Sequence, residues 1–125
     1  MSNQKTDGLK TIMVCAETDI PTDGSVITRS VEGQQIALAR HNPGSKRVIA
    51  FESRCPHMQA PLKFGRVVDG EVVCPWHFFR FDTETGNTIA CPNSEMHLAT
   101  FTVEQRDGNV LVQLNSESSD RAVSQ

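Results

Sequence analysis

The chain has 125 residues and a formal net charge of −3, which is the size of one compact domain. A negative net charge argues against nucleic acid or an anionic membrane as the partner, because both bind a basic face. The longest early apolar run, residues 12–16, is much shorter than a signal-peptide core or a membrane span. We therefore expect a single domain (residues 1–125) in the cytoplasm, with a protein or a small molecule as its partner.

Short stretches rich in Val, Ile, Thr and Phe alternate with turn residues along the chain, which is the pattern of an all-β protein. Two dipeptides, Asp69-Gly70 and Asp107-Gly108, are two-residue hairpin signals and predict antiparallel pairing. The polar residues 1–8 and the serine-rich residues 115–125 are predicted to be mobile tails. The predicted strands are residues 11–15, 25–31, 35–40, 47–51, 65–68, 71–74, 79–81, 88–90, 99–104 and 110–114.

Two cysteine–histidine pairs recur in the same order, Cys55 with His57 and then Cys74 with His77, with 16 residues between the pairs. Two thiolates can hold one iron of a [2Fe–2S] cluster while two imidazoles hold the other, and this mixed ligation defines a Rieske centre. Each pair is predicted to lie in a loop at the end of a strand, with the Asp-Gly hairpin fixing the separation of the loops. A structural zinc ion would accept the same ligand types, although the C-x-H spacing is tighter than zinc sites usually have.

The residues around these ligands resemble the Rieske ferredoxin family over roughly residues 9–114. The matching segments are Cys55-Pro56-His57, Cys74-Pro75-Trp76-His77, Phe81-Asp82 and Thr85-Gly86. The resemblance implies an all-β Rieske iron–sulfur fold with an antiparallel β base, residues 9–51 and 83–114. A small cluster-binding lobe, about residues 52–82, would be inserted into that base and hold one [2Fe–2S] cluster. A third loop, residues 90–93, resembles the family's proline-containing loop that covers the cluster, with Pro92 as the shield.

Four positions place the chain within that family. The high-potential branch carries hydroxyl side chains where this chain has Phe79 and Phe81, and an extra disulfide where it has Ala60 and Trp76. Hydrogen bonds to cluster sulfurs raise the reduction potential, so the chain looks like the soluble, low-potential type. It departs from the family at Phe78, where a glycine is usual.

The resemblance implies a one-electron carrier, not an enzyme in itself, that passes electrons from a flavin reductase to the terminal oxygenase of an aromatic-ring hydroxylating system. An oxygenase subunit would also need a mononuclear iron held by two histidines and a carboxylate, and only His41 and His97 remain for it. The alternatives are a small subunit of assimilatory nitrite reductase and a zinc-stabilised interaction domain. We expect a monomeric carrier.

Several apolar residues near the predicted ligands are candidates for shielding the cluster or docking a partner: Pro56, Met58, Pro75, Trp76 and Pro92. Residues 52–82 contain four acids and four bases, so the lobe is formally neutral and electrostatic steering to it should be modest. Outside the ligand set, Cys15 and Cys91 are expected to be small buried residues. His41 is expected to be a solvated loop residue, and His97 a packed or surface residue.

Overall fold

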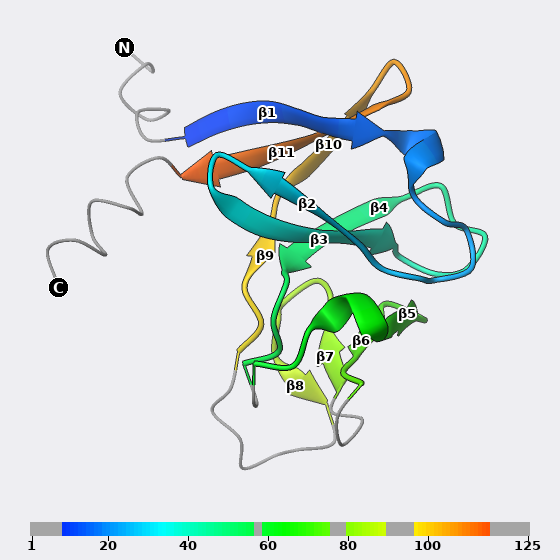
Figure 1. Cartoon of the computed structure of the whole chain (residues 1–125). Helices are drawn as coiled ribbons and strands as arrows, with labels where there is room; N and C mark the ends of the chain where they lie inside the picture. Colours follow the sequence, from blue (N-terminus) through cyan, green and yellow to red (C-terminus); the bar gives the residue numbers. More distant parts are fainter. Residues whose placement is uncertain (1–8, 57–58, 76–79, 90–96, 116–125) are drawn as a thin grey trace, which may run out of the picture.

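The structure is a computed structural model that describes residues 9–56, 59–75, 80–89 and 97–115 (Figure 1). Antiparallel strands dominate these ranges, which confirms the predicted all-β class; two single-turn 3-10 helices, η2 (Glu17–Asp19) and η3 (Leu62–Phe64), join them. The strands are β1 (Leu9–Ala16), β2 (Ile27–Val31), β3 (Gln34–Arg40), β4 (Val48–Glu52), β5 (Arg66–Val68), β6 (Glu71–Val73), β7 (Arg80–Asp82), β8 (Thr88–Ile89), β9 (Thr100–Phe101), β10 (Val103–Arg106) and β11 (Asn109–Asn115).

The strands form three sheets, ordered β1-β11-β10, β2-β3-β4-β9 and β5-β6-β7-β8. Figure 1 shows the first two sheets together as the base and the third as a separate lobe beneath them. The single strand predicted at residues 99–104 is wrong, because the chain changes sheets there. β9 pairs with β4 in one sheet, whereas β10 pairs with β11 in another, so Thr102 separates two short strands.

Three hairpins have the same two-residue turn. Glu32, Asp69 and Asp107 take left-handed φ angles of 53°, 54° and 56°, and the glycine that follows each also has a positive φ. Two successive positive φ angles define the type I′ turn, whose twist matches the flanking strands. The sequence predicted this hairpin at Asp69 and Asp107. The hairpin at Glu32 was not among those predicted, since glutamate is an unusual residue for the left-handed region.

Residues 36–40 of β3 and 48–51 of β4 are buried without interruption, because two different cores cover the opposite faces of these strands. Ile36 and Leu38 face the base core, whereas Ala37 and Ala39 face the lobe core, and β4 alternates in the same way. The base core comprises Cys15, Ile20, Val31, Ile36, Leu38, Val48, Ala50, Val110, Val112 and Leu114. The lobe core comprises Val26, Ala37, Ala39, Ile49, Phe51, Cys55, Ala60, Leu62, Val67, Val72, Cys74, Phe81 and Leu98. The middle sheet therefore gives the lobe an apolar platform.

The lobe sheet continues past residue 82, the predicted end of the lobe. β8 pairs with β7 through Arg80↔Ile89 and Phe81↔Thr88, so the sheet extends to Ile89. The extra strand follows a turn in which Asp82 Oδ1 accepts hydrogen bonds from the amides of Glu84 and Thr85 at 2.7 and 3.2 Å. This side-chain cap stabilises the reversal that brings β8 back beside β7.

Candidate metal centre

Cys55 follows β4 and lies in a loop that closes on itself. Its amide donates to Ala60 O at 2.9 Å, and the Gln59 amide donates to Cys55 O at 2.7 Å. Gln59 takes a left-handed φ of 63°, which reverses the chain within these few residues. Arg54 Nη1 donates to Gln59 O at 3.0 Å and ties this reversal to the end of the strand. The side chain of Cys55 is fully buried, so the loop holds the sulfur in apolar surroundings.

Cys74 follows β6 and is also fully buried. The backbone just before Cys74 lies unusually close to Gly65, the residue that precedes β5. A Cβ at Gly65 would lie 2.1 Å from Val73 O and 3.3 Å from Pro75 Cδ. Only a residue without a side chain fits there, and the approach fixes the end of β6 from which Cys74 extends.

The two cysteines come from loops that are far apart in sequence, yet both belong to the lobe core. Buried thiol side chains at the ends of β4 and β6 suit thiolate ligation of an iron–sulfur cluster. The predicted partners His57 and His77 lie outside the described residues. Within residues 9–56, 59–75, 80–89 and 97–115, no three His, Cys, Asp or Glu side chains gather as a metal site.

The other candidate residues divide into those the structure describes and those it does not. Pro56 and Pro75, each next to a predicted ligand cysteine, are half-buried. Cys15 lies in the base core, as expected. His97 is exposed, and its Nε2 lies 2.6 Å from Thr85 O. The predicted shielding residues Met58, Trp76 and Pro92, together with Phe78, Phe79 and Cys91, lie outside the described residues.

Glu52 is a half-buried carboxylate at the end of β4, near the first cysteine loop. Burial raises its pKa, although a hydrogen bond from the Ala99 amide, 2.8 Å long, and the nearby His97 act in the opposite direction. The Glu52 amide in turn donates to Ala99 O at 2.9 Å. These two bonds join the segment leading to Cys55 with the segment that follows His97.

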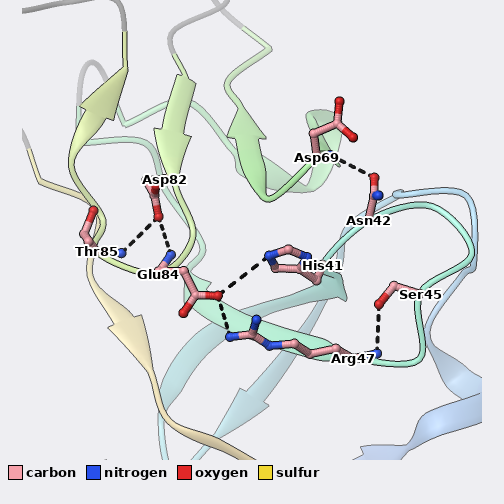
Figure 2. Close-up of polar contacts among 8 residues, drawn as sticks. All are labelled: His41, Asn42, Ser45, Arg47, Asp69, Asp82, Glu84 and Thr85. Atoms are coloured by element: carbon pink, nitrogen blue, oxygen red, sulfur yellow. Dashed lines mark hydrogen bonds and ion pairs between the residues drawn. The ribbon is translucent and has the colours of Figure 1, made fainter.

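His41 lies in the β3–β4 loop, as expected, but its side chain is only 29% exposed, because it lies between the base and the lobe. Figure 2 shows it, with Arg47, facing Glu84. Glu84 Oε2 lies 2.6 Å from an Arg47 nitrogen and 3.7 Å from His41 Nε2. The Gly70 amide donates to His41 O at 3.0 Å. A Cβ at Gly70 would lie 2.9 Å from the His41 ring, so the ring covers the β5–β6 turn closely. We call His41, Arg47 and Glu84 the base–lobe clasp.

Comparison with known proteins identifies the family. The chain belongs to the Rieske [2Fe–2S] domain family, whose model matches residues 10–110. The predicted family, the antiparallel β fold and the cofactor, one Rieske-type [2Fe–2S] cluster, are thereby confirmed.

Individual relatives fall into two groups. The chain is 34% identical over 97 residues to the oxygenase component of chloroacetanilide N-alkylformylase from Rhizorhabdus wittichii, covering 75% of this chain but 27% of that protein. It is 29% identical over 107 residues to the ferredoxin component of the naphthalene 1,2-dioxygenase system from Pseudomonas putida, covering 86% of this chain and 98% of that protein. The chain therefore spans about a quarter of the oxygenase relative and nearly all of the ferredoxin relative.

A solved structure shows the same fold. A chain from the complex of reduced oxygenase and oxidised ferredoxin in carbazole 1,9a-dioxygenase superposes with a TM-score of 0.67 at 29% identity, covering 81% of this chain and 99% of that chain. The ferredoxin relatives agree with the predicted class, an electron-transfer ferredoxin. Among the residues placed by the structure, none of the helices has the length and apolar character to span a membrane.

Proposed function

We propose that this protein is a one-electron carrier that takes electrons from a flavin-containing reductase and delivers them to the terminal oxygenase of an aromatic-ring hydroxylating system. The observation that supports it most directly is the likeness to a ferredoxin component over 98% of that protein's length. The fully buried Cys55 and Cys74 in one core supply the sulfur ligands that this function needs. The protein is not itself an enzyme in this proposal.

In the proposed site Cys55 and Cys74 would hold one iron, and His57 and His77 would hold the other. When bound, the cluster accepts and releases one electron. The lobe core keeps water away from the two cysteines, because they share it with Ala60, Leu62 and Phe81, which are fully buried. The hydrogen bonds of Cys55 with Gln59 and Ala60, and the close approach at Gly65, hold both cysteines in place, so little reorganisation should accompany a change of charge.

The proposal includes a cytoplasmic location, because reducing surroundings preserve thiolate ligands. It also includes a monomeric state for the carrier. Both partners are proteins. A net charge of −3 is a poor match for nucleic acid. The related ferredoxins are components of dioxygenase systems, which supports a ring-hydroxylating oxygenase as the electron acceptor.

Reconstitution tests this function. The purified protein is mixed with NADH, a flavin-containing reductase and a terminal oxygenase of this type, and product formation is measured against a Cys74→Ser control. We expect turnover that depends on the wild-type protein and disappears with the control. Cluster-loaded protein that neither accepts electrons from such reductases nor supports any such oxygenase would contradict the proposal. Activity found only within a stable complex with a reductase chain would favour a fixed subunit instead of a carrier.

A further inference from the structure

The lobe has equal numbers of acidic and basic side chains, but not every basic side chain lies beside an acidic one. Arg80 Nε pairs with Glu71 Oε1 at 3.1 Å, and the carboxylates of Glu52 and Asp82 accept backbone hydrogen bonds. In contrast, neither Arg54 nor Lys63 lies within 4.0 Å of a carboxylate in the part of the chain that the structure describes. Arg66 has no such ion pair among the described residues either, but its Nη2 donates to Asp23 O at 3.0 Å. The formal neutrality expected from the sequence therefore conceals cations without an ion pair in the described ranges, among them Arg54 and Lys63.

Arg54 and Lys63 line the same groove, which has a volume of about 270 Å³. Its other lining side chains bear hydroxyl or amide donors, or are apolar, and none is a carboxylate: Thr28, Gln35, Ser53 and Pro61. We call this surface the basic groove. Asp69, an exposed acid of the lobe, lies away from the basic groove. Its amide donates to Asn42 Oδ1, just past the end of β3, whereas the groove residue Gln35 lies near the start of β3.

An exposed aromatic side chain stands beside the basic groove. Phe64, the last residue of η3, is 69% exposed, the largest exposure among the large hydrophobic side chains that the structure describes. Lys63 Nζ lies 5.2 Å from the centroid of its ring, within the range of a cation–π contact. An exposed ring next to charged donors is typical of a protein interface, in which an aromatic anchor packs at the centre and ionic contacts set the orientation.

We propose that the basic groove is a docking site for an acidic side chain on the surface of the terminal oxygenase, with Phe64 as the apolar anchor beside it. The inference rests on the proposed carrier function. Charge complementarity supports it, because a donor-rich groove without a lining carboxylate fits a carboxylate. Position supports it too, because Arg54 directly precedes Cys55 and holds the Cys55 loop through Gln59 O. A carboxylate bound there would bring the oxygenase next to the predicted cluster.

The energetics suit a carrier that must dissociate after each electron. Exposed ion pairs contribute little to affinity but accelerate association and make it sensitive to salt. We expect reversal of a single groove charge to lower the association rate about tenfold at low ionic strength. The effect should shrink as salt screens the charges.

The test compares Lys63→Glu with Lys46→Glu, a matched reversal of another exposed lysine, in the β3–β4 loop. Stopped-flow rates of electron transfer from the reduced protein to a terminal oxygenase are measured across a series of salt concentrations. We expect Lys63→Glu to be about tenfold slower at low salt and less salt-dependent, and Lys46→Glu to stay within about twofold of wild type. Phe64→Ser should slow transfer without changing the salt dependence. Unchanged visible spectra and midpoint potentials show that the cluster is intact in each variant.

Zero-length carbodiimide coupling gives a second measurement, in which Lys63 should be joined to an oxygenase carboxylate. Equal rates and equal salt dependence for wild type and Lys63→Glu would overturn the docking proposal, as would equal slowing by Lys46→Glu, which would indicate overall charge. If the wild-type protein with an intact cluster reduces no oxygenase, the carrier function itself is overturned, and the docking site with it. Loss of self-association in Lys63→Glu, with oxygenase transfer unaffected, would assign the groove to a second copy of this chain.

Discussion

Substitution of Gly65 by alanine tests how tightly the backbone holds the second cysteine loop. The added Cβ would lie 2.1 Å from Val73 O, more than 1 Å inside an ordinary carbon–oxygen contact of about 3.4 Å. Its φ of −91° lies outside the left-handed region, so this contact is the main source of the penalty. Because Val73 O is a backbone atom, no side-chain rotation can relieve the overlap.

The expected loss of stability in Gly65→Ala follows from the backbone that the added Cβ would displace. Arg66 pairs with Val73 in the β5–β6 ladder, so displacing Val73 by about 1 Å disturbs both that pairing and the position of Cys74. We expect a destabilisation of about 3 kcal/mol, in the upper range for overpacking, and a fall in Tm of roughly 10 °C or more. The cluster's visible spectrum should weaken or shift as well.

Gly108→Ala is the matched control. Gly108 has a φ of +80° but no atom within 4 Å of an added Cβ, so only the left-handed backbone penalty applies, about 1 kcal/mol. Thermal unfolding followed by circular dichroism and by cluster absorbance compares the two variants. A Gly65→Ala protein with the Tm and spectrum of wild type, or one no less stable than Gly108→Ala, would refute the reasoning.

Three further predictions concern the lobe. Cys55→Ser and Cys74→Ser should each abolish the cluster, measured as iron and acid-labile sulfide, whereas Cys15→Ser in the base core should retain it; a normal spectrum in the first two would contradict the ligand assignment. The wild-type midpoint should lie near −150 mV, the lower end of the Rieske range of about −150 to +300 mV, and Phe81→Tyr should raise it if the hydroxyl reaches a cysteine sulfur; a wild-type value well above zero would refute this. Burial raises the pKa of Glu52, so folding favours its protonated form and stability should fall as pH rises from the ordinary carboxyl pKa of about 4.3 through the raised folded value. Glu52→Gln should remove that part of the pH dependence in urea unfolding between pH 4 and 7; an unchanged profile would show that Glu52 does not contribute.

The sequence predicted the features that depend on residue type and spacing. Alternating apolar residues indicated the strands, and the Asp-Gly dipeptides indicated two of the three type I′ hairpins. It could not show that the chain changes sheets at Thr102, because a strand that crosses between sheets keeps the same alternation. Nor could it show which core each face of β3 and β4 contacts, since both faces are apolar.

The site shows the same division. The cysteine positions follow from the motif, and the structure places both in the lobe core. The base–lobe clasp was not predicted, because His41 and Glu84 are 43 positions apart and neither belongs to a local motif. The contact of the His41 ring with Gly70 is likewise visible only in the structure. The basic groove was not predicted, because the formal charge of residues 52–82 does not show where each charged side chain lies in the fold.

The central claim is that two cysteines and two histidines hold a [2Fe–2S] cluster in this lobe. Pulsed EPR of the dithionite-reduced protein, prepared with ¹⁵N-labelled histidine, tests it most directly. We expect a reduced [2Fe–2S] signal coupled to two histidine nitrogens, lost in Cys55→Ser and Cys74→Ser, with two irons and two labile sulfides per chain. A cluster signal without nitrogen coupling, or bound zinc without labile sulfide, would contradict the account.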